Sequence, residues 1–141
     1  EIIDGKPLVL ATSTENVREV ARRMTERNVG AVAVIDDQKL VGMFTERDLM
    51  TRAVAQSLDL DNTKISMVMT RELATAGPDE PVGDCLQKMH KLNCRHLPVV
   101  DRGNLIGMIS LRDLLQVDNQ EVRHKAQLLG ELVTYSPDYE S

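Results

Sequence analysis

The fold is decided by residues 40–50, LVGMFTERDLM, which recur as residues 105–115, LIGMISLRDLL. The two copies align without a gap, so that Leu40 corresponds to Leu105 and every later position keeps the same offset. Each copy is an apolar run closed by a hydroxyl residue (Thr45 or Ser110), with an aspartate (Asp48 or Asp113) three positions later. This pattern predicts a buried strand that leads into the N-cap of a helix. We expect the hydroxyl and the carboxylate to form a capping box, at a helix N-terminus suited to anionic ligands.

The same offset continues upstream of these stretches, so the chain contains a duplication rather than one repeated motif. Identical residues recur along a helix-like and a strand-like segment, as Val17/Val82, Met24/Met89, Asn28/Asn93, Val34/Val99 and Asp36/Asp101. Repeats of this length are supersecondary units that cannot bury their apolar faces alone. We therefore expect two half-domains that pack against each other about a pseudo-twofold axis.

Apolar periodicity predicts the order β-α-β-β-α in each repeat, and hence an α+β fold. In repeat 1 the expected elements are a strand at 8–10, a helix from 17 to about 28, strands at 29–35 and 40–44, and a helix from 46. In repeat 2 the first strand is expected at 73–76. The predicted boundaries are residues 1–60 for repeat 1, 61–117 for repeat 2 and 118–141 for a C-terminal helix and tail, with the helix at 119–133.

The amino-acid composition argues against several classes of function. Aromatic residues make up 2% of the chain and the net charge is −5, which argues against a nucleic-acid partner. No apolar run approaches the length that a bilayer requires, so we expect no membrane-spanning helix in this segment. Two cysteines are too few for a disulfide framework, which indicates a reduced, cytoplasmic setting. No metal-ligand spacing or nucleophile–base pattern occurs, so we expect neither a metal site nor an enzyme.

The chain resembles the tandem cystathionine-β-synthase (CBS) domain pair, also called a Bateman module. The resemblance covers about residues 4–116 and depends on GMFTERD at 42–48, VMT at 68–70, HLPVVD at 96–101 and GMISLRD at 107–113. Repeat 1 departs from the pattern at 31–34, where Ala33 takes the position of Pro98. The resemblance implies a regulatory module that senses adenine nucleotides, less often S-adenosylmethionine or NAD, without catalysis.

The resemblance also implies two clefts between the repeats, each joining the aspartate of one repeat to the base pocket of the other. Carboxylates repel phosphate but accept hydrogen bonds well from the two ribose hydroxyls, and the cap hydroxyls can donate to ribose or phosphate. One cleft would combine Thr45, Asp48, Met69, Ala74, Cys94, Arg95 and His96. The other would combine Ser110, Asp113, Val9, Val29 and Gly30.

The two clefts should differ in charge. Arg95 or His96 would bring a cation to phosphate in the Asp48 cleft, whereas Gly30 and Ala31 bring none to the other. We therefore expect the Asp48 cleft to prefer the more charged nucleotide. The alternative for each site is a helix cap with no ligand role. For Cys94 a small buried apolar residue is favoured over a redox sensor.

The sequence thus predicts a regulatory, energy-sensing module that binds AMP, ADP or ATP and requires no cofactor. The ligand would change the packing of the repeats, or of a homodimer formed through apolar helix faces. The C-terminal helix would carry this change to an unidentified regulated protein. The alternative is a ligand-free module that only dimerises a larger polypeptide.

Overall fold

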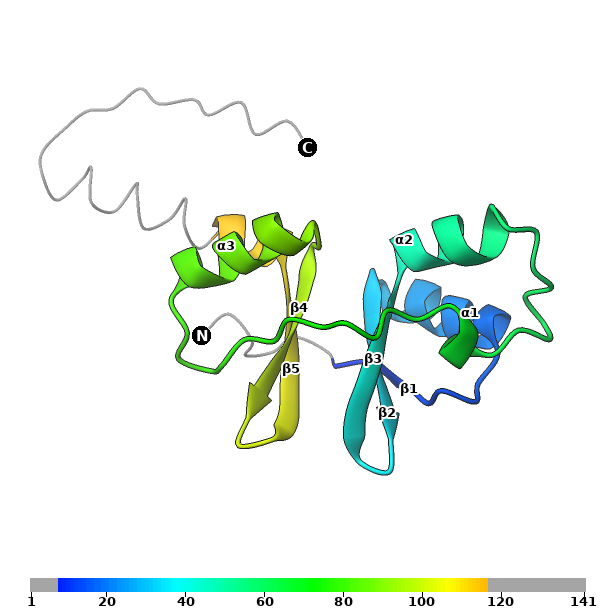
Figure 1. Ribbon diagram of the computed structural model, residues 1–141, viewed down its shortest axis with the longest axis horizontal. Helices are drawn as coiled ribbons and strands as arrows, with labels where there is room; N and C mark the ends of the chain where they lie inside the picture. The colour runs from blue at the N-terminus through cyan, green and yellow to red at the C-terminus, as the bar shows by residue number, and fades with distance from the viewer. Residues whose placement is uncertain (1–7, 117–141) are drawn as a thin grey trace, which may run out of the picture.

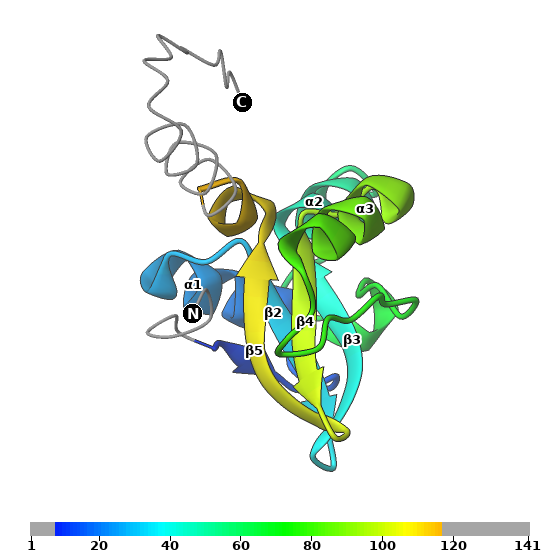
Figure 2. The same cartoon turned by 90° about the vertical axis from the view of Figure 1, so that its left-hand side faces the viewer.

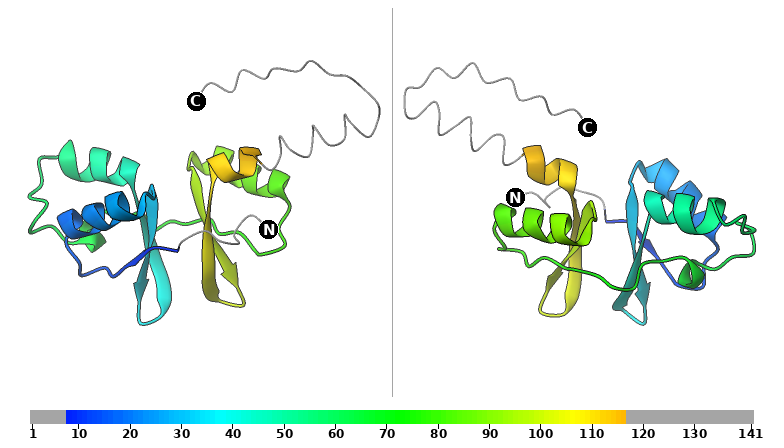
Figure 3. Two further views of the ribbon diagram at one scale, coloured as in Figure 1. Left: turned by 180° about the vertical axis from the view of Figure 1, so that it is seen from behind. Right: turned by 45° about the horizontal axis from the view of Figure 1, so that its top comes forward.

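The computed structural model describes residues 8–116, which form two similar halves (Figure 1). The first half contains β1 (Leu10–Ala11), α1 (Val17–Arg27), β2 (Ala31–Asp36), β3 (Lys39–Thr45), α2 (Glu46–Asp48) and η1 (Leu49–Val54). After η2 (Ile65–Met67), the second half contains α3 (Val82–Leu92), β4 (His96–Asp101), β5 (Asn104–Ser110) and a helical segment at 111–116. The two sheets lie at the centre, with α1 and α3 on opposite outer sides (Figures 1 and 3). The predicted α+β double repeat is confirmed.

The two hairpins repeat each other in register. In the first, β2 pairs antiparallel with β3 from Ala31↔Thr45, with a bulge after Val34. In the second, β4 pairs with β5 from His96↔Ser110, with the bulge after Val99, the counterpart of Val34. Each turn consists of two residues with positive φ, Asp37 and Gln38 in one hairpin and Arg102 and Gly103 in the other. Such turns match the right-handed twist of the strands, so the duplication extends to backbone conformation.

Each repeat has its own core. Val17, Val20 and Met24 of α1 pack with the strands of the first repeat, whereas Cys85 and Met89 of α3 pack with those of the second. Both helices end at an asparagine in the left-handed conformation, Asn28 and Asn93, a residue type that tolerates this conformation. The apolar spacing read from the sequence therefore places the helices correctly.

A duplicated ion pair fastens the first strand region of each repeat to its helix. In repeat 1, Arg23 bonds to Glu15 and donates to the Leu10 carbonyl at 2.7 Å. In repeat 2, Lys88 lies 2.7 Å from Glu80 and donates to the Thr75 carbonyl at 2.7 Å. The hydrogen bond from the cation is the main cause that lowers the pKa of each glutamate. The side chain of Arg23 is accordingly only partly exposed.

The helix expected from Glu46 is not a continuous α-helix. Only α2 is α-helical, and η1 continues as a π-helix in which Ala55 N–H donates to the Met50 carbonyl. The Thr51 hydroxyl donates to the Arg47 carbonyl at 2.8 Å within this stretch.

The strand expected at 73–76 is also shorter than predicted, because one bridge, Ala76↔Val99, is what remains of it. The predicted helix at 119–133 lies outside the described residues. Within residues 8–116, no helix has both the length and the apolar character needed to span a bilayer.

Candidate functional site

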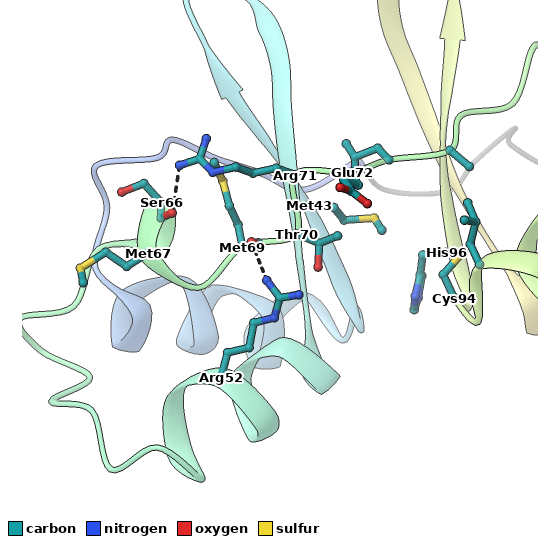
Figure 4. Close-up of a pocket in the computed structure, with 13 residues that line it drawn as sticks. Met43, Arg52, Ser66, Met67, Met69, Thr70, Arg71, Glu72, Cys94 and His96 are labelled. Atoms are coloured by element: carbon teal, nitrogen blue, oxygen red, sulfur yellow. Dashed lines mark hydrogen bonds between the residues drawn. The ribbon is translucent and has the colours of Figure 1, made fainter.

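A pocket of about 650 Å³ lies where the two repeats meet (Figure 4). Met43 of β3, Arg52 of η1 and residues 66–67 and 69–72 line it on the side of repeat 1. Ala74, Cys94 and His96 line it on the side of repeat 2. Its volume lies within the usual range for small-molecule sites, about 300–1,000 Å³. The pocket at the contact between the repeats is therefore large enough for a nucleotide-sized ligand.

Asp48 forms the predicted capping box beside this pocket. The Asp48 amide donates to Thr45 Oγ1 at 3.2 Å, and the Thr45 amide donates to Asp48 Oδ2 at 3.0 Å. The same pair of bonds recurs between Ser110 and Asp113, at 3.1 and 3.4 Å. Both capping boxes are local, so the spacing in the sequence was sufficient to predict them.

The carboxylate of Asp48 is buried behind the pocket wall, with the residue only 4% exposed. The Thr70 hydroxyl, on the lining, donates to both of its oxygens, at 3.0 and 3.2 Å. Arg52 Nε lies 3.6 Å from Asp48 Oδ1. Sequence reasoning missed Thr70 and Arg52, although Arg52 follows Asp48 by one helical turn and Thr70 belongs to the quoted VMT motif.

Two arginines give one side of the pocket positive charge. Arg52 Nη1 donates to the Met69 carbonyl at 3.0 Å, and Arg71 Nη2 donates to the Ser66 carbonyl at 3.1 Å (Figure 4). Both guanidiniums are exposed, and Glu72 is the acidic residue of the lining. A guanidinium can bind phosphate oxygens through two parallel hydrogen bonds. This side of the pocket is therefore suited to an anionic group.

His96 lies on the opposite side of the pocket, at the contact between the repeats. A Cβ built on Gly30 would lie 3.4 Å from His96 Cε1, so the ring is close to the backbone of repeat 1. Burial lowers the pKa of His96, although Glu46 and Asp113 oppose the shift. Burial thus favours the neutral imidazole over the cation at this position. Nearby, Arg47 Nη1 donates to the Asn93 carbonyl at 2.9 Å and joins the two repeats directly.

The lowered pKa of His96 predicts a loss of stability in mild acid. Histidine in an unfolded chain has a pKa of about 6.5. Below this pH the unfolded chain binds a proton at His96 that the folded chain does not yet bind. The free energy of unfolding should therefore fall as the pH drops from about 7 toward the lower folded pKa, and His96→Gln should flatten this part of the profile. Urea denaturation at several pH values measures it. The control is Gln87→Ala at an exposed position of α3, which removes no titratable group and should leave the profile unchanged. If His96→Gln kept the pH profile of the wild-type chain, this result would contradict the lowered pKa of His96.

The structure places the predicted site residues in two groups. Met69, Ala74, Cys94 and His96 line the pocket, with Thr45 and Asp48 directly behind it. Arg95 is exposed and is absent from the lining, and its carbonyl accepts from Leu111 N–H.

The residues predicted for the second cleft are absent from the lining of this pocket, although Gly30 lies close to His96. Val9 is buried in the first core and Val29 packs against that core. The Gly30 carbonyl accepts from Glu46 N–H at 3.0 Å, while Ser110 and Asp113 form their own capping box. Among residues 8–116, no group of three or more His, Cys, Asp or Glu could hold a metal ion.

Two β-α-β-β-α repeats around a shared pocket define a class of tandem-repeat regulatory modules. The chain belongs to the CBS domain family, whose pattern matches residues 3–55 and 65–119.

Two relatives and one solved structure illustrate this similarity. CBS domain-containing protein YhcV of Bacillus subtilis is 39% identical over 100 residues, which are 71% of each chain. CBS domain-containing protein CBSX3, mitochondrial, of Arabidopsis thaliana is 33% identical over 124 residues. The match covers 84% of this chain and 60% of that protein. The CBS domain pair of protein MJ0100, solved in complex with 5′-methylthioadenosine and S-adenosyl-L-methionine, superposes with a TM-score of 0.76. That structure is 31% identical, and the match covers 85% of this chain and 94% of that one.

Proposed function

We propose that this CBS pair binds an adenosine-containing ligand, most simply AMP, ADP or ATP, in the pocket between its repeats. The observation that carries the proposal is that one pocket combines a buried carboxylate–hydroxyl pair, Asp48 and Thr70, with the guanidiniums of Arg52 and Arg71. A ribose needs acceptors for its hydroxyls, and a phosphate needs cations. The adenosine ligands of the similar MJ0100 pair support the same class of ligand.

Each part of such a ligand has a complementary region of the lining. The base packs against Ala74 and Cys94, and the ribose hydroxyls replace the Thr70 hydroxyl at Asp48. The phosphates extend toward Arg52 and Arg71, with His96 on the opposite side. S-adenosylmethionine and NAD share the adenosine part and are less favoured, because the first lacks phosphate and the second is much larger.

A ligand in this pocket would touch both repeats and thereby alter their relative packing. We propose that this change is the output of the module, that it regulates a partner protein in the cytoplasm in response to the energy state, and that the chain is not an enzyme. The predicted role of residues 119–133 in passing the change to the partner remains a prediction.

Calorimetry on two matched variants tests this proposal. Asp48→Ala should weaken ATP and AMP binding at least about tenfold, because a hydrogen bond to a charged group contributes about 1.5–3 kcal/mol. Asp113→Ala removes the equivalent carboxylate of the other repeat and should leave ATP binding in the pocket nearly unchanged. Circular dichroism checks that both variants fold. Equal losses of AMP and ATP affinity in both variants would contradict the predicted difference between the clefts.

A ligand-free dimerisation module remains the second candidate, because large apolar side chains are exposed on two helices. Met50 and Val54 of η1 and Leu92 of α3 are each more than half exposed, and both helices lie at the same end of the molecule (Figures 1 and 2). They would form the predicted homodimer. Thermal unfolding separates the candidates, since ligand at 100 times its Kd stabilises the folded state by about 2.7 kcal/mol. No shift with AMP, ATP, S-adenosylmethionine or NAD would favour the dimerisation module.

A further inference from the structure

One hydrogen bond joins the two halves of the chain directly. Arg47 Nη1, from α2 in repeat 1, donates at 2.9 Å to the carbonyl of Asn93, the residue that ends α3 in repeat 2. Among the residues that the structure describes, no other hydrogen bond connects residues 8–71 with residues 72–116. The two helices lie at the same end of the molecule (Figures 1 and 2). Their relative placement therefore has one polar link, and Arg47 provides it.

Each end of this bond is attached to one wall of the pocket. Arg47 directly precedes Asp48, the buried carboxylate of the proposed ribose site. Asn93 directly precedes Cys94, which lines the side proposed for the base. The Cys94 amide is itself fixed to α3, because it donates to the Met89 carbonyl at 3.0 Å. The bond thus ties the ribose wall to the base wall, although Arg47 is absent from the lining.

The charge of Arg47 suits its position at the end of α3. The last carbonyls of a helix carry a partial negative charge, so a cation beside them is stabilising. Burial raises the pKa of the Cys94 thiol, and the positive charge of Arg47 is among the causes that oppose this shift. The guanidinium therefore lies near both the end of α3 and the base wall of the pocket. A neutral side chain of similar length would lose the hydrogen bond and the charge together.

The equivalent bond is missing from the other side of the molecule. Arg112 is the counterpart of Arg47, and Asn28 is the counterpart of Asn93. Asn28 also ends its helix in the left-handed conformation, so the acceptor has an equivalent place in the fold. Within residues 8–116, however, no hydrogen bond joins Arg112 to Asn28. The link is therefore one-sided, and it lies on the side of the pocket.

We infer that Arg47 is a positioning residue: it holds the two walls of the pocket at the separation that the ligand needs, without touching the ligand. The inference rests on the proposed function. A ligand that binds only when the walls are correctly placed loses affinity in proportion to the fraction of chains that have this arrangement. The factor is the same for every ligand of the pocket, so AMP, ADP and ATP should lose affinity equally when Arg47 is replaced. The loss of a phosphate-binding residue differs, because its effect grows with the number of phosphates.

The test is calorimetry with AMP, ADP and ATP on the wild-type chain and on variants at position 47. Arg47→Met keeps a long side chain but removes the donor, and it should weaken all three nucleotides by one factor, about three- to tenfold, the range for one hydrogen bond. Arg47→Lys keeps a charged donor on a long side chain and should stay within about twofold of wild type. Arg52→Met provides the contrast. It removes a guanidinium from the lining and should weaken ATP more than AMP.

The matched control is Arg112→Met, which replaces the exposed counterpart of Arg47 and should leave all three affinities unchanged. Circular dichroism checks that each variant folds. If Arg47→Met kept the wild-type affinities, or if its loss grew from AMP to ATP, the inference would be overturned and the proposed function would stand. Equal losses in Arg47→Met and Arg112→Met would overturn it as well. An absence of nucleotide binding by the wild-type chain would overturn the proposed function together with the inference.

Discussion

Phe44→Ala is expected to lower the free energy of unfolding by about 3–5 kcal/mol, the usual cost of truncating a fully buried phenylalanine. Phe44 is the only phenylalanine in a chain without tryptophan, and its side chain is completely buried on β3. Its pairing partner on β2 is Val32, which is also completely buried. The aliphatic neighbours are too small to fill the space that the ring would leave. Single domains of this size are stable by about 5–15 kcal/mol, so the loss would be a large part of the total.

Urea denaturation followed by circular dichroism measures this loss. Phe44→Leu is the matched variant and should cost clearly less, because it keeps most of the buried apolar volume. The exposed Glu26 of α1 provides the control, since Glu26→Ala should change the free energy by no more than about 0.5 kcal/mol. A Phe44→Ala protein as stable as the Glu26→Ala protein would show that the ring is not part of the core.

Gly42→Ala is expected to destabilise the protein by about 1–3 kcal/mol, the usual cost of overpacking. A Cβ at position 42 would lie 2.7 Å from Met69 Sδ and 3.0 Å from the Thr70 carbonyl oxygen. The methionine side chain can move, but Thr70 is held by backbone hydrogen bonds with Met43 at 2.8 and 2.9 Å. The added methyl group must therefore push β3 and the segment that follows η2 apart.

Gly83→Ala provides a control of opposite sign. Gly83 lies in α3 with nothing within 4 Å of an added Cβ, and alanine is the better helix former. This variant should gain about 0.5–1 kcal/mol. The urea denaturation midpoints of the two variants, each compared with the wild-type midpoint, measure these changes in stability. If Gly42→Ala stabilised the protein as Gly83→Ala does, this result would contradict the close contact between β3 and Thr70.

Several parts of the fold and site were predictable because they depend on contacts within a few residues. The capping boxes at Thr45 and Ser110 span three positions, so spacing was enough. The helix predicted from residue 17 to about 28 followed from apolar periodicity and is observed as α1. The continuous α-helix after Glu46 was the wrong prediction, because apolar spacing over so few residues does not distinguish an α-helix from a π-helix.

The sequence by itself determined the duplication, the order of elements in each repeat and the family, because one constant offset relates the two copies in both apolar pattern and turn chemistry. The tertiary structure decided how the site is built. Thr70 meets Asp48, a residue distant in the sequence, only because the segment after η2 pairs with Met43, and this pairing also brings Arg71 to the rim of the pocket. The difference between Ala33 and Pro98 is visible in the sequence. The reduction of the first strand in repeat 2 to the single bridge between Ala76 and Val99 is not, because strand pairing depends on which segments the fold places side by side.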